Sequence, residues 1–123
     1  MVVFSNQRLG PTAELLVSNE VAAEMLWATA QAACPAANAR WEFELVAWLS
    51  HRATAMRDHL DVAEIAWTPE HFELQLQFLV AAIRQAAQAS SHASALERWC
   101  GLVEAYPRVC VQVSRRWSPS LTV

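Results

Sequence analysis

Apolar side chains recur at helical spacing between residues 67 and 87, on two sides of a predicted helix. Thr68 and Pro69 form a typical start, because a Thr hydroxyl can cap free amides and proline fits the first helical position. A helix that is apolar on two sides needs neighbours on both, so it is the centre of a bundle or half of an oligomer interface. The broad row contains Phe72, Leu76, Leu79, Val80, Ile83 and Ala87, and the second row contains Leu74, Phe78 and Ala81.

Three other segments each have one apolar face, as amphipathic helices do: residues 12–33, 36–64 and 94–106. The first of these faces includes both Leu26 and Trp27. Ser18 and Asn19 interrupt it; we expect the helix to continue, and a break with a new cap there is the alternative. Residues 107–117 fit a short helix, or else a strand that could pair only with residues 2–4.

These elements predict an all-α fold, namely an up-and-down helical bundle of four main helices plus a short C-terminal helix. The 123 residues correspond to one domain. Residues 1–11 are expected to form an N-terminal arm and residues 118–123 a C-terminal tail. Short connections make consecutive helices antiparallel neighbours.

The amino-acid composition indicates the type of coding sequence and the partners that charge would favour. The chain is rich in Ala and has nine Arg but no Lys, a usage typical of a GC-rich, bacterial coding sequence. A net charge of −3 is too small to indicate a polyionic partner. Arg108, Arg115 and Arg116 are a weak footprint for nucleic acid, so we expect no nucleic-acid partner.

Targeting signals and reactive motifs are missing from the sequence pattern. No run of about 18 apolar residues indicates a membrane helix, and residues 1–11 lack the pattern of a signal peptide, so we expect a cytoplasmic protein without a membrane partner. The three cysteines lack the close spacing of zinc or redox motifs and are expected to be reduced. We expect no metal and no cofactor, because the histidines lack Glu-x-x-His or His-x-x-x-His spacing. No catalytic residue is assigned.

One set of residues could line a ligand site between helices. Arg beside Trp gains a cation–π contact and can hold a carboxylate or phosphate, and His can titrate near neutral pH. The simpler interpretation is an Arg that extends along the bundle to a carboxylate such as Glu24 or Glu73. The candidate ligand-binding residues are Trp41, Trp48, Arg52, His59, His71 and Gln75.

The leading functional hypothesis is a non-enzymatic helical bundle that acts through protein–protein contacts with itself, as a homodimer, or with another protein. Its motivation is the second apolar row, so Leu74, Phe78 and Ala81 are the candidate interface residues. The alternative is a bundle that binds a small molecule in a Trp/Arg/His-lined pocket between helices.

Overall fold

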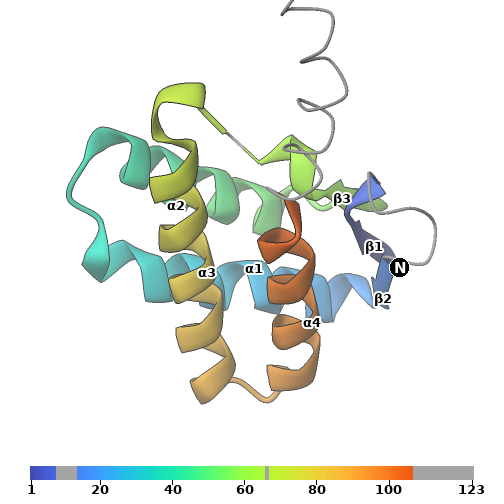
Figure 1. The fold of residues 1–123 in the computed structure, drawn as a ribbon. Coiled ribbons are helices and arrows are strands. Elements are labelled where there is room, and N and C mark those ends of the chain that lie inside the picture. Colours follow the sequence, from blue (N-terminus) through green and yellow to red (C-terminus); the bar gives the residue numbers. More distant parts are fainter. Residues whose placement is uncertain (8–13, 66, 107–123) are drawn as a thin grey trace, which may run out of the picture.

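The computed structural model describes residues 1–7, 14–65 and 67–106, which form four α-helices and three short strands. Helices α1 and α2 lie side by side, and α3 and α4 form a second pair that crosses α1 (Figure 1). The small sheet packs against α4. The helices are α1 (Asn19–Ala33), α2 (Arg40–Thr54), α3 (Phe72–Ala89) and α4 (Ala93–Glu104); the strands are β1 (Val2–Ser5), β2 (Glu14–Val17) and β3 (His59–Asp61); the 3-10 turns are η2 (Cys34–Ala36), η3 (Val62–Glu64) and η4 (Pro69–His71).

The sheet makes the predicted all-α class wrong, although the protein is mostly helical. Its strand order is β2-β1-β3, with β1 antiparallel to β2 and parallel to β3. The predicted N-terminal arm therefore contains the central strand. Val2 and Phe4 are fully buried, because they point from alternate positions of β1 into the core.

The predicted first helix combines a strand and a helix, so the break at Ser18 is correct and continuity is wrong. The Ser18 hydroxyl accepts a hydrogen bond from the Val21 amide at 3.2 Å and caps α1. In β2 Leu15 is buried while Leu16 is 57% exposed, the alternation of an edge strand.

The predicted second helix, residues 36–64, is also too long, since α2 spans only Arg40–Thr54. Glu42 accepts hydrogen bonds from the Asn38 and Ala39 amides and fixes its start. Beyond α2 the chain returns as β3 to pair with β1, an interaction between residues far apart in sequence.

The predicted helix over residues 67–87 and the one over 94–106 correspond to α3 and α4. Thr68 differs in detail, because its side chain makes no capping bond and instead both its amide and its hydroxyl donate to Gln75. The segments predicted at 107–117 and 118–123 lie outside the described residues.

One hydrophobic core joins the sheet to all four helices. Trp99 of α4 is fully buried, and its ring meets Phe4 of β1 edge-on with 5.4 Å between centroids. Leu79 and Ile83 of α3 are fully buried in the same core, as the broad apolar row predicts.

Candidate functional site

The structure separates the six predicted ligand-binding residues into several environments. Trp41 stacks on His71 with 5.8 Å between ring centroids, and it meets Phe78 in a T-shaped arrangement with 5.8 Å between centroids. This cluster joins the start of α2 to the start of α3. Two of the six predicted ligand-binding residues, Trp41 and His71, therefore pack against each other.

Gln75 and His59 have structural contacts of their own. Gln75 is 1% exposed, and its Oε1 accepts a hydrogen bond from the Thr68 amide at 2.8 Å. The His59 side chain is exposed, while its backbone carbonyl accepts a hydrogen bond from Arg52.

Trp48 and Arg52 do come together, as predicted. The Arg52 guanidinium lies 5.6 Å from the centre of the Trp48 ring, a cation–π distance. Its Nη1 donates to Glu64 at 3.5 Å and its Nη2 to the His59 carbonyl at 3.1 Å. The acidic partner is thus Glu64 of η3, whereas Glu24 and Glu73 were the expected ones.

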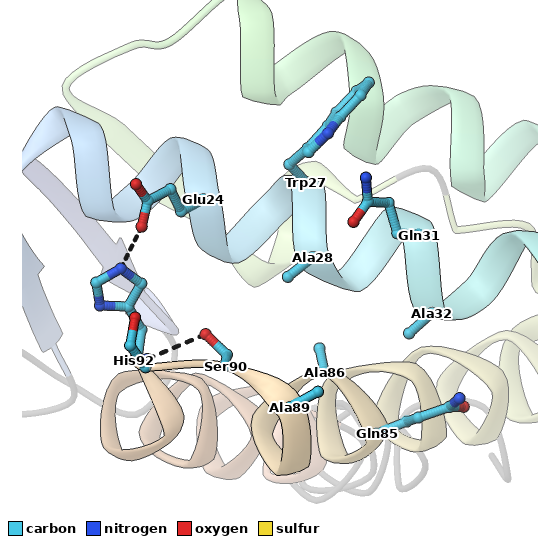
Figure 2. A pocket seen from close by; sticks show the side chains of 11 residues that line it. Glu24, Trp27, Ala28, Gln31, Ala32, Gln85, Ala86, Ala89, Ser90 and His92 are labelled. Atoms are coloured by element: carbon cyan, nitrogen blue, oxygen red, sulfur yellow. Dashed lines mark hydrogen bonds and ion pairs between the residues drawn. The ribbon is translucent and has the colours of Figure 1, made fainter.

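Another hollow lies between α1 and α3, and we call it the α1–α3 groove. It has a volume of about 510 Å³. Figure 2 shows Ala28 and Ala32 of α1 facing Ala86 and Ala89 of α3, so small methyl groups form much of its lining. The described residues that line it are Glu24, Trp27, Ala28, Gln31, Ala32, Gln85, Ala86, Ala89, Ser90, Ser91 and His92.

A contact between His92 and Glu24 lies at one end of the groove. The imidazole Nε2 of His92 contacts the carboxylate of Glu24, which joins the turn after α3 to α1 (Figure 2). The Ser90 hydroxyl accepts a hydrogen bond from the His92 backbone amide at 3.0 Å. Because this serine bonds to the main chain of His92 and not to its ring, the three residues do not form a nucleophile–base relay.

Trp27 stands beside the groove with 47% of its surface exposed. It also borders a second hollow of about 240 Å³, on the side of α2, which Ala23, Ala53 and Thr54 line. Periodicity assigned Trp27 and Leu26 to one buried face, yet only Leu26 is fully buried. The alanines around Trp27 could have indicated its exposure, because their side chains are too small to cover an indole.

The predicted interface residues lie on the outer side of α3. Leu74 is 53% exposed, Ala81 is exposed, and Phe78 is half-buried against Trp41. Gln85, which lines the groove, falls on the same helical stripe as Leu74 and Ala81. The outer row and the groove are therefore neighbouring parts of one surface.

Residues 1–7, 14–65 and 67–106 contain neither a metal-binding cluster nor a membrane-spanning helix. No cluster of three or more His, Cys, Asp or Glu side chains in that part of the chain could hold a metal ion. None of the helices described there is both long and apolar enough to cross a bilayer.

No protein-family model matches the chain, and neither a curated protein nor a solved structure shows significant similarity to it.

Proposed function

We propose that this protein acts through protein–protein contacts, and that a second copy of the same chain binds at the α1–α3 groove. The exposed indole of Trp27, placed between two hollows, is the observation that carries the proposal. Tryptophan is strongly enriched among the residues that dominate binding energy at interfaces. Leaving half of such a ring in water forgoes the free energy that burial would supply.

The shape of the groove favours a protein as its occupant. Alanine side chains on facing helices leave room for a bulky side chain or another helix to approach closely. Gln31, Gln85 and Ser90 supply uncharged hydrogen-bonding groups around this apolar centre. An apolar centre with a polar border is the usual anatomy of a protein interface.

Charge and symmetry favour a second copy over an unrelated partner. Of the described residues that line the groove, only Glu24 and His92 are ionisable, and they pair with each other. Two identical grooves can therefore meet without strong repulsion. Because Trp27 and the groove are adjacent, a twofold axis would let each indole cover the alanines of the other chain.

Sedimentation equilibrium at micromolar concentration tests the proposal. We expect a dimer for the native sequence. Trp27→Ala should raise the dimer dissociation constant by about 30-fold, equivalent to ~2 kcal/mol, because the anchoring ring is lost. Circular dichroism should show unchanged helix content, since this side chain is half exposed.

A matched pair of alanine substitutions locates the interface. Ala89 and Ala81 are both exposed residues of α3, but only Ala89 lines the groove. We expect Ala89→Arg to dissociate the dimer and Ala81→Arg to leave it intact. Dissociation by Ala81→Arg alone would place the interface on the outer row with Leu74, and a monomeric native protein would contradict self-association.

A further inference from the structure

A polar hollow at the C-terminal end of α2 plays no part in the proposed dimer contact. Its volume is about 430 Å³. Its lining comes from the C-terminal part of α2, the residues that follow it, and η3, elements whose places Figure 1 shows. The described residues that line it are Trp48, His51, Arg52, Ala55, Arg57 and Glu64.

Arg52 is held rigidly at this hollow. Only 7% of the residue is exposed, and the Trp48 ring and the His59 carbonyl fix the plane of its guanidinium. Its Nε is buried with no hydrogen-bond partner among the described residues. This Nε is sealed from the hollow, but the Nη1 contact with Glu64 is long, at 3.5 Å, so the terminal nitrogens have remaining capacity for an anionic ligand.

The lining charges point to an oxyanion. Arg52 and Arg57 contribute two positive charges, and Glu64 contributes one negative charge. The His51 ring adds a hydrogen-bonding group from the neighbouring position on α2. Glu64 makes only one long contact with Arg52, so two arginines at one hollow favour a ligand with enough oxygen atoms to contact both.

We propose that this hollow binds a phosphate group, either free phosphate or a phosphate monoester, with Arg52 and Arg57 as its cationic ligands. Arg52 supplies a preorganised fork at the inner wall, and the exposed Arg57 completes the site from the solvent side. Glu64 competes with the phosphate for Arg52. The site is independent of the proposed dimer contact, because none of its lining residues lines the groove.

Isothermal titration calorimetry with inorganic phosphate, glycerol phosphate and acetate at constant ionic strength tests the assignment. We expect both phosphates to bind at least about tenfold more tightly than acetate. Tighter binding of glycerol phosphate than of free phosphate would identify a monoester as the better ligand. Equal binding of acetate and phosphate, or no binding of either phosphate, would overturn the proposal.

Arg57, which follows α2, and Arg40, at the start of α2, provide a matched comparison. Arg57→Gln should weaken phosphate binding by about three- to tenfold, since one charge-assisted contact is lost. Arg40→Gln changes the net charge equally at the far end of α2, where 93% of the arginine side chain is exposed. It should leave the affinity unchanged; equal weakening in both variants would show nonspecific charge attraction and contradict the site.

Glu64 gives a prediction of opposite sign. Glu64→Gln keeps an oxygen acceptor for the Asp61 amide but removes the charge that competes for Arg52. We expect phosphate to bind about threefold more tightly or better in this variant. Unchanged or weaker binding, with an unchanged melting temperature, would show that Arg52 serves only to hold Glu64.

Discussion

Asp61 is a buried carboxylate that connects two distant parts of the chain. Its Oδ1 accepts hydrogen bonds from the Ser5 hydroxyl at 2.9 Å and from the Gln7 amide at 2.7 Å. Its Oδ2 accepts one from the Ala63 amide at 2.9 Å, which caps η3. A charged acceptor with three donors repays the cost of its burial, so the end of β1 is fixed to the end of β3.

Removing this carboxylate should be costly. We expect Asp61→Ala to lower the free energy of unfolding by about 3 kcal/mol, because the Ser5 hydroxyl and two amides lose their acceptor. Urea denaturation followed by circular dichroism measures the change. Asp58→Ala is the control, since this nearby aspartate is exposed, and it should cost less than about 0.5 kcal/mol. Equal effects would mean that the network contributes no stability.

The two described cysteines should differ sharply in reactivity. Cys34 is exposed, whereas burial and then the neighbouring Glu104 raise the pKa of the Cys100 thiol to about 11. The thiolate is the reactive form. A pKa of about 11 in place of the ordinary 9.0 lowers the thiolate fraction of Cys100 by about 100-fold at neutral pH. We expect iodoacetamide at pH 8 to modify Cys34 at least about 100-fold faster in the native protein, as peptide mass spectrometry can measure. Comparable rates would contradict the buried thiol.

The same thiol should make stability depend on alkaline pH. A Cys100 pKa of about 11 in the folded state exceeds the ordinary value of 9.0, so the unfolded chain loses this proton first. Stability from the neutral thiol is therefore complete below pH 9 and declines as the pH rises to about 11. Cys100→Ala should show a smaller decline over that window in urea titrations. Parallel curves for the two proteins would refute the linkage.

At the scale of elements, β1 shows why a short strand can resemble a flexible arm in the sequence. Val2 and Phe4 are fully buried, but a run of four strand residues is too short to show a period by itself. Its partners β2 and β3 are distant or equally short. The apolar residues of Glu14–Val17 also continue the helical spacing of α1, so a strand and a helix appeared as one amphipathic segment.

Truncating the central strand tests its role in the core. Phe4→Ala should cost about 3–5 kcal/mol of unfolding free energy, because a fully buried ring that packs on Trp99 leaves a cavity. Leu16→Ala on β2 should cost less than about 1 kcal/mol, since Leu16 is 57% exposed. Thermal unfolding monitored by circular dichroism measures both. A loss of unfolding free energy below about 1 kcal/mol for Phe4→Ala would indicate that residues 1–5 are an arm outside the core.

At the scale of the whole molecule, two helical hairpins and a small sheet share one core, and the two proposals concern separate hollows at its surface. The groove combines alanines with mostly uncharged polar side chains, whereas the hollow beside Arg52 carries excess positive charge. These properties separate the two proposals. Dimer formation should therefore be insensitive to Arg57→Gln, and phosphate binding should be insensitive to Trp27→Ala.

Several features followed from the sequence because they depend on neighbours within a few turns. The apolar rows of α3, the face of α4 and the contact of Trp48 with Arg52 all arise at helical spacing. The surplus apolar surface of α3 was predicted in the same way, and Leu74 is indeed exposed.

Only the tertiary structure decided which residues meet across the chain. The pairing of β1 with β3, the fixing of Asp61 and the choice of Glu64 for Arg52 all join segments whose contact no local pattern encodes. The exposure of Trp27 is of the same kind: its helix favoured burial, but the crossing of α1 by α3 placed small alanines beside the indole and left it half in water. Periodicity specifies a face, whereas packing decides how much of that face a partner covers.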